Sequence, residues 1–289
     1  MTLYTTMSFW FEPTEDYSFI ARLWFVAKEF LQFMCYRKNV FLPVANLSAP
    51  AGEGRPRTFA AFNMLGETGD GELETLKKGR YIKLTYLSST EGRILNDISS
   101  RLLYTRHIPD TYASGCSINA ARFVMITAAF EWEFKRLYPD GVTKSEKVLA
   151  VEAKATEELQ KLVDNNTGDL KTKYKFLQKF IKSNSLQSEV VHAGNGLGEI
   201  VDPFGKMLYS LNDTELLYSE MGKRLADQRN NFAHGNLDID FIDKSLLDLI
   251  YIERIVYAMQ LKYYGVDDKN IQNAINELFR CGLSLTKGD

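Results

Sequence analysis

The chain has 289 residues, of which 45% are hydrophobic, and its 35 Lys and Arg nearly balance its 37 Asp and Glu. This length and apolar content suffice for one large domain or two modest domains with a packed core. A net charge of −2 excludes a protein whose whole surface attracts nucleic acid, so any RNA site must be a local feature.

Localisation and metal binding can also be judged from the sequence. The apolar run over residues 19–36 is interrupted by charged residues and is no membrane span, and residues 1–7 lack the basic start of a secretory signal. Cys35, Cys116 and Cys281 are far apart, with no CxxC pair and no neighbouring histidine pair, which indicates buried thiols rather than a zinc site. We therefore expect a cytoplasmic protein that uses no metal, cofactor or membrane.

Residues 1–110 predict a mixed α/β region. Apolar side chains recur at helical spacing over residues 16–37, which predicts an amphipathic helix. Residues 40–44 predict a short edge strand containing Pro43, and residues 81–87 alternate as a strand does. Most of the Gly and Pro of this region lies in residues 48–57 and 66–72, which predict loops.

Residues 111–289 predict an antiparallel bundle of four to six helices, so the fold class is mainly α, with a smaller α+β region before the bundle. Helices are expected over residues 118–137, 143–163, 170–181, 240–264 and 267–281. Thr143 with Glu146, and Asn212 with Glu215, resemble capping boxes, and the helix that opens at Asn212 ends at Gly235. The glycine-rich residues 191–205 predict a loop, but no strand precedes it and no Gly-Lys-Ser/Thr follows, so it does not indicate nucleotide binding.

The strongest chemical signal is the segment Arg-Asn-Asn-Phe-Ala-His, from Arg229 to His234, at the end of that helix. A guanidinium can hold a phosphate through two parallel donors, and an imidazole with a pKa near ~6.5 can transfer a proton at cellular pH. On a regular helix, five positions turn about 500°, so the two side chains point about 140° apart. A long arginine side chain, a loosened last turn or a second protomer could bring both groups to one phosphate.

Spacing alone is a weak criterion, because Arg101 and His107 also fit an Arg-x(4–6)-His pattern. Apolar Leu102 follows Arg101, beside the expected domain boundary. Polar Asn230 follows Arg229, late in a helix of the expected bundle. This context favours the second match.

The segment from Arg229 to Gly235 resembles the motif of the HEPN superfamily, whose members are helical bundles with Arg-x(4–6)-His and commonly a polar residue after the arginine. The resemblance covers about residues 112–282. It implies a metal-independent endoribonuclease in which Arg229 and His234 are catalytic and Asn230 supports them. The RNA 2′-hydroxyl would be the nucleophile, and the product would carry a 2′,3′-cyclic phosphate.

The resemblance also implies a homodimer in which two motifs face each other. A mixed N-terminal region before the bundle is similar to the ApeA-like anti-phage defence proteins, although the first region here is short for that family. The implied role is phage defence or a toxin-like response, with RNA as substrate and an antitoxin or a phage-derived trigger as partner.

Alternatives remain at each of these positions. Arg229 and His234 can cap carbonyl groups at a helix end, and the bundle can be a non-catalytic module that dimerises or binds a partner. Glu131 or Glu133 could form a structural salt bridge with Arg229, or Glu131 could lie in the cleft. Lys223 and Arg224 could contact RNA phosphates or form a solvated face, and His107 and His192 are expected to be structural.

Overall fold

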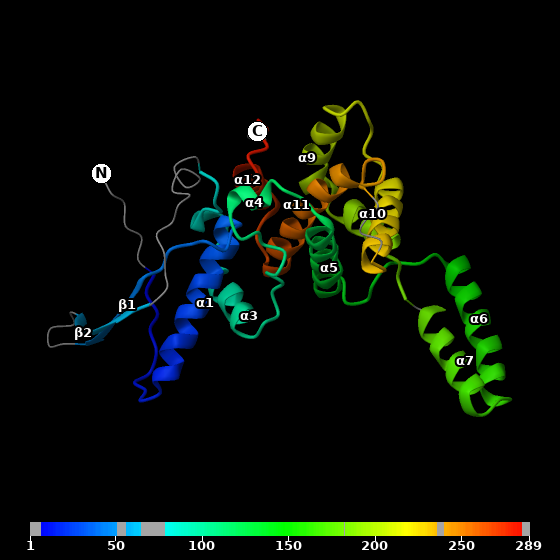
Figure 1. Ribbon diagram of the computed structural model, residues 1–289, viewed down its shortest axis with the longest axis horizontal. Coiled ribbons are helices and arrows are strands. Elements are labelled where there is room, and N and C mark those ends of the chain that lie inside the picture. The colour runs from blue at the N-terminus through cyan, green and yellow to red at the C-terminus, as the bar shows by residue number, and fades with distance from the viewer. Residues whose placement is uncertain (1–6, 51–55, 65–78, 182, 236–239, 285–289) are drawn as a thin grey trace. The chain divides into compact units, whose positions relative to one another are not determined.

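The computed structural model describes residues 7–50, 56–64, 79–181, 183–235 and 240–284, and these residues are mainly helical (Figure 1). A small two-stranded antiparallel sheet lies near the N-terminus, which confirms the mainly α fold class with a minor β element. The chain forms two compact units. The first unit combines Met1–Ala129 with Val256–Asp289, and the second unit is Phe130–Ile255. A domain boundary near residue 110 stays a prediction.

The first helix of the first unit confirms its prediction. α1 spans Tyr17–Cys35, and the Asp16 side chain caps it by accepting a hydrogen bond from the Ser18 N–H. Phe30, Phe33 and Met34 are buried at helical spacing, so the amphipathic pattern identified the core-facing side.

The sheet lies later in the chain than the sequence predicted. β1 is Val44–Pro50 and β2 is Pro56–Asn63, and Val44 pairs with Asn63 at one end of the ladder. The strand expected over residues 40–44 is therefore wrong except at its last residue. The carbonyl of Leu42 instead accepts a hydrogen bond from Nε1 of Trp24 on α1. In the segment 48–57, expected to be a loop, residues 48–50 end β1 and residues 56–57 begin β2. Residues 51–55 lie outside the described residues.

The strand expected over residues 81–87 is also wrong. The Ile82 N–H donates to the Met34 carbonyl, after which the backbone turns into the short 3₁₀-helix η2, Leu84–Tyr86. Alternating apolar residues form a strand only when a neighbouring strand supplies hydrogen bonds. Here the N–H groups of Tyr86 and Leu87 donate within the turn, to the carbonyls of Lys83 and Leu84. The loop expected over residues 66–72 lies outside the described residues.

Two further helices of the first unit were not predicted, namely α3, Glu91–Ser99, and α4, Tyr112–Gly115. α12, Asp268–Leu278, follows the prediction for residues 267–281, with Asp267 as its N-cap. The core of this unit is formed by fully or nearly fully buried apolar side chains, among them Phe33, Leu87, Ile94, Phe123, Ile126, Tyr257, Ile271 and Ile275.

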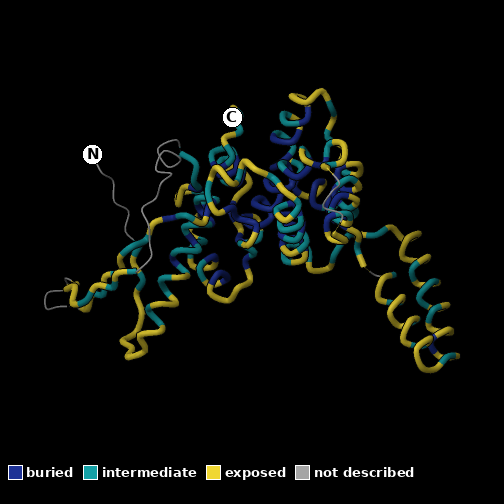
Figure 2. Tube along the Cα trace, viewed as in Figure 1, coloured by how far each residue is buried: buried dark blue, intermediate teal, exposed yellow. Residues whose placement is uncertain are grey.

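The long helices of the prediction are present. α5 is Ala120–Leu137, α6 is Glu146–Asp164, α7 is Gly168–Ile181 and α11 is Ser245–Tyr264. α11 begins five residues later than predicted. The N-cap of α6 is Ser145 rather than Thr143, because the Ser145 hydroxyl accepts the hydrogen bond from the Val148 N–H. α6 and α7 pack side by side (Figure 1), and most of their residues are exposed (Figure 2).

The glycine-rich residues 191–205 are helical, so the predicted loop is wrong. α8 is Leu186–Gly196 and α9 is Gly198–Ser210. The glycine at position 194 serves close packing rather than a turn, because a Cβ there would lie 2.4 Å from the ring of Tyr218. Glycine in a helix interior costs stability, so its presence at a tight contact reflects tertiary packing that the linear pattern cannot show.

α10, Tyr218–Ala233, begins later than predicted. Asn212 does not open it, since its Nδ2 donates to the Leu208 carbonyl and satisfies the end of α9 instead. The predicted end is confirmed, because Gly235 has φ of +82° and its N–H donates to the Phe232 carbonyl. Across the described ranges, none of the helices is long and apolar enough to cross a membrane.

Candidate functional site

The motif from Arg229 to His234 lies on the last turn of α10 in the second unit. Arg229 and Asn230 are helical, and His234 is the C-cap, whose N–H donates to the Asn230 carbonyl. Arg229 is half-buried, whereas Asn230 and His234 are exposed. The motif therefore sits at a solvent-facing helix end, as the sequence predicted.

Arg229 is held by an acidic partner from another helix. Its Nη2 donates to Oε2 of Glu131 on α5 at 2.8 Å, and the two side chains are 34% and 23% exposed. Of the two acids that the sequence analysis left open, Glu131 makes the salt bridge with Arg229. Glu133 is buried and pairs with Arg136.

Helix geometry directs Arg229 and His234 to different sides of α10. α10 is regular through Ala233, so the five positions between the two residues turn about 500° and leave the side chains about 140° apart. Within the described residues, the imidazole of His234 makes no hydrogen bond or ion pair. α10 is thus regular up to Ala233, and His234 leaves the helix as its C-cap.

Close packing between two helices sets the surroundings of Arg229. Gly222 of α10 lies against the backbone of α8, where an added Cβ would be 2.8 Å from Cα of Gln187. Gly194, further along α8, meets Tyr218 at the start of α10. The two helices therefore run antiparallel at close range, with the first turn of α8 against the first half of α10.

A buried acid of α8, Glu189, lies close enough to the salt bridge to interact electrostatically with both Glu131 and Arg229. Glu189 is only 5% exposed, and its Oε2 has no hydrogen-bond partner among the described residues. Burial and repulsion from Glu131 raise its pKa to about 7, while attraction to Lys135 and Arg229 opposes the shift. A buried carboxyl that titrates near neutral pH beside an arginine is a candidate for proton transfer.

Glu189 was missed because the sequence analysis did not recognise α8. The available signal was the cap: Ser185 and Ser188 form a reciprocal capping box, and Leu186, Val190 and Ala193 repeat at helical spacing behind it. Glu189 is buried along with these apolar residues, and a buried acid is rare unless it has a partner.

Lys223 and Arg224 differ in their surroundings. Lys223 is exposed and makes no ion pair within the described residues. Arg224 donates from Nε to Oδ2 of Asp248 at 2.7 Å and from Nη2 to Oδ1 at 2.8 Å. The Asp248 side chain is fully buried and also accepts a hydrogen bond from the Tyr209 hydroxyl. The charge of Arg224 thus compensates a buried carboxylate.

The other two histidines lie in aromatic surroundings. His107, in the first unit, packs against the rings of Tyr36, Tyr104 and Tyr257, and both of its ring nitrogens are buried without a partner among the described residues. Burial lowers the pKa of His107 to about 3, and repulsion from Arg122 and Lys38 adds to this. In the second unit, His192 meets the rings of Phe134 and Tyr138 edge to face.

The competing Arg101–His107 match has a different setting. Arg101 is exposed in a left-handed turn with φ of +56°, whereas His107 is 2% exposed. The two residues share no helix, and a phosphate in solvent cannot reach a sealed imidazole.

Comparisons with protein-family models, with curated proteins and with solved structures found no match to this chain.

Proposed function

We propose that this protein is a metal-independent endoribonuclease of the HEPN type. Arg229 and His234 are the catalytic pair, and Asn230 is a supporting polar group. The observation that carries the proposal is the motif at the exposed end of α10, within a helical unit, where Arg229 is partly open to solvent.

The chemistry requires no group beyond the protein and the RNA. A base removes the proton of the 2′-hydroxyl, whose oxygen attacks the adjacent phosphorus, and the P–O5′ bond breaks as the 5′-oxygen receives a proton. The products are a 2′,3′-cyclic phosphate and a 5′-hydroxyl. Arg229 stabilises the charge on the non-bridging oxygens, and His234 transfers a proton.

The salt bridge with Glu131 is compatible with phosphate binding. An arginine has five N–H donors, of which Glu131 engages one on Nη2. Glu131 therefore orients the guanidinium and leaves donors for a phosphate. Lys223, exposed on the same helix, adds positive charge along the path of the RNA backbone.

The divergence of Arg229 and His234 supports a homodimeric site. Because the two side chains point about 140° apart on α10, one phosphate is more easily reached by Arg229 of one protomer and His234 of the partner subunit. A two-fold axis would generate two such composite sites from one interface. We assign the protein a cytoplasmic role in phage defence or a toxin-like response, with an antitoxin or a phage-derived molecule as its regulator.

The first experiment is cleavage of total RNA in EDTA by the full chain and three variants. His234→Ala and Arg229→Ala should lose activity, whereas Asn231→Ala, between them on the same helix, should keep it. The proposal would be wrong if EDTA abolished RNA cleavage, or if His234→Ala cut RNA as well as the wild type.

A mixing experiment tests the composite site. Arg229→Ala and His234→Ala protomers are each inactive, but a heterodimer contains one site with both residues intact. Half of the dimers in a statistical mixture are heterodimers, so activity should recover to about a quarter of wild type. No recovery, with exchange of protomers verified, would place the pair within one chain.

The second candidate function is a non-catalytic module that dimerises or binds a partner protein. The Arg229–Glu131 ion pair favours it, since a buried or half-buried salt bridge is a common structural use of an arginine. For this function, Arg229→Ala should lower the free energy of unfolding. Neither the wild type nor this variant should cut RNA under conditions in which the protein is folded.

A further inference from the structure

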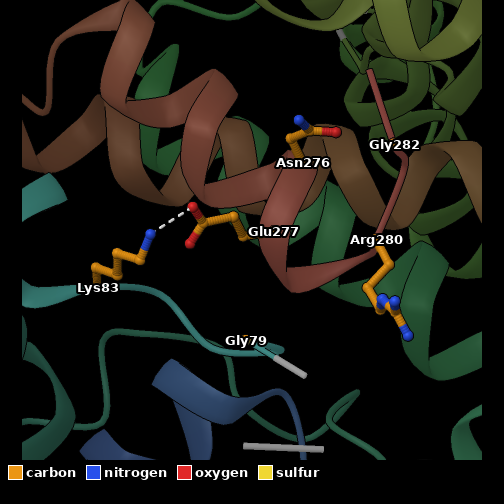
Figure 3. Close-up of a pocket in the computed structure, with 6 residues that line it drawn as sticks. All are labelled: Gly79, Lys83, Asn276, Glu277, Arg280 and Gly282. Atoms are coloured by element: carbon orange, nitrogen blue, oxygen red, sulfur yellow. Dashed lines mark hydrogen bonds and ion pairs between the residues drawn. The ribbon is translucent and has the colours of Figure 1, made fainter. Parts of the chain in front are cut away.

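An open pocket of about 400 Å³ lies in the first unit, between the chain near Gly79 and the end of α12 (Figure 3). Six described residues line it: Gly79, Lys83, Asn276, Glu277, Arg280 and Gly282. Figure 3 shows the Lys83 side chain directed at Glu277, while Arg280 extends on another side of the pocket. Pockets of roughly 300–1,000 Å³ are the size that small molecules occupy.

Glu277, the one acid among the described lining residues, is already engaged. Nζ of Lys83 donates to Oε1 of Glu277 at 2.6 Å, and the Tyr86 hydroxyl donates to the same oxygen at 2.7 Å. Nζ of Lys83 also donates to the Tyr86 hydroxyl at 3.2 Å. An ammonium group has three N–H donors, so one donor of Lys83 has no partner within the described residues.

Arg280 in the lining and Arg80 beside it have no acidic partner among the described residues. Arg280 is exposed and makes no hydrogen bond or ion pair through its guanidinium with a described residue. Arg80, next to the lining residue Gly79, stacks its guanidinium 3.7 Å from the ring centre of Tyr112, and its buried Nε has no hydrogen-bond partner among the described residues. Burial, and secondly repulsion from Arg280, lower the pKa of Arg80.

The backbone at Arg280 is a second observation. The N–H of Arg280 donates to the Glu277 carbonyl and the N–H of Cys281 to the Asn276 carbonyl, which together form a Schellman motif. Arg280 occupies the left-handed position of that motif with φ of +49°, where glycine is favoured. Gly265 has the same role after α11, with φ of +87°. An arginine held in a strained position beside a pocket indicates a use for its side chain.

We propose that this pocket binds a small phosphorylated molecule, with its phosphate or diphosphate group between Arg280 and Lys83. Among the described residues, Lys83 and Arg280 in the lining and Arg80 beside it, set against Glu277, carry two positive charges in excess. A phosphate monoester, which carries about −1.5 to −2 at neutral pH, matches that excess better than a carboxylate does. The planar guanidinium also fits two phosphate oxygens at once.

Titration of the full chain with pyrophosphate tests the site, at a fixed ionic strength close to the physiological value. Isothermal calorimetry should show saturable binding, and Arg280→Gly should weaken it by about tenfold to a hundredfold, the usual effect of removing a charged hydrogen-bond donor. Arg280→Gly suits a left-handed position, so this variant is expected to fold.

Arg101→Gly is the matched control, because Arg101 is also exposed with a left-handed backbone, φ +56°, but does not line the pocket. It should bind pyrophosphate as the wild type does. Equal binding by Arg280→Gly, an equal loss in Arg101→Gly, or heat identical to that with sulfate at the same ionic strength would each overturn the proposal. Absence of binding by the wild type to pyrophosphate and to a nucleoside diphosphate would overturn it as well.

Discussion

Arg229 on α10 and Glu131 on α5 are joined by a hydrogen-bonded ion pair of 2.8 Å in the second unit, with Glu189 buried beside them. The pair gives the guanidinium a fixed orientation at a site open to solvent. Mutations can separate two roles of Arg229. Loss of the ion pair lowers the stability of the fold, and loss of the guanidinium removes the proposed phosphate contact.

A double-mutant cycle at this pair measures the first consequence. Because both side chains are partly exposed, the coupling between Arg229→Ala and Glu131→Ala should be about 0.5–1 kcal/mol in urea unfolding. Glu131→Gln keeps a hydrogen-bond acceptor and should retain most RNA cleavage, whereas Arg229→Ala should abolish cleavage. If Glu131→Gln were as inactive as Arg229→Ala, Glu131 would have a chemical role that orientation does not explain.

Glu189 predicts a pH-dependent stability. Its pKa in the folded protein is about 7, above the ordinary value of 4.5, so the folded state binds the proton more tightly than the unfolded state. This contribution is present below about pH 4.5 and is lost as the pH rises through 7, at a cost on the order of 3 kcal/mol. Glu189→Gln should therefore be more stable than wild type at pH 8 and similar at pH 4.5.

The control for this prediction is Glu215→Gln, since Glu215 is exposed between α9 and α10. Urea unfolding of the three proteins at pH 5, 6.5 and 8 gives the comparison. Equal pH slopes for wild type and Glu189→Gln would show that the buried carboxyl does not titrate in this range.

His107 predicts the opposite pH dependence. Its pKa is lowered to about 3, so between that value and 6.5 the unfolded state binds a proton that the folded state does not. Stability is lost as the pH falls below 6.5. His107→Phe, which keeps a ring among Tyr36, Tyr104 and Tyr257, should remove this acid sensitivity and leave stability at pH 7.5 unchanged or higher. A large destabilisation at pH 7.5 would mean that the imidazole makes a needed polar contact.

Gly222 predicts a packing defect. An added Cβ would meet Cα of Gln187 at 2.8 Å, and backbone cannot move aside as a flexible side chain can. Gly222→Ala should destabilise the protein by about 1–3 kcal/mol and, because α8 and α10 separate, should also reduce any activity of the Arg229 site.

Gly92→Ala on α3 is the comparison for Gly222→Ala, since the space around Gly92 is open. It should be neutral or stabilising by about 0.5–1 kcal/mol, as expected for alanine in a helix. Thermal unfolding of both variants measures the two changes in stability. Equal changes would mean that close contact at Gly222 does not hold α8 and α10 together.

Local patterns were sufficient where an element is specified by its own residues. The apolar repeat located α1, and Gly235 located the end of α10, because helix periodicity and left-handed glycine are properties of short segments. The sequence by itself also placed Arg229, Asn230 and His234 at a helix end. It did not distinguish Glu131 from Glu133 as the partner of Arg229.

Only the tertiary structure decided the features that depend on distant segments. Among the described residues no strand pairs with residues 81–87, which form a 3₁₀ turn instead. Glycine is needed at position 194 of α8 because the ring of Tyr218 fills the space of a side chain there. The salt bridge of Arg229 joins residues 98 positions apart, and the raised pKa of Glu189 arises from burial among three helices. Pairing, close approach and burial are relations between segments, so no local pattern could determine them.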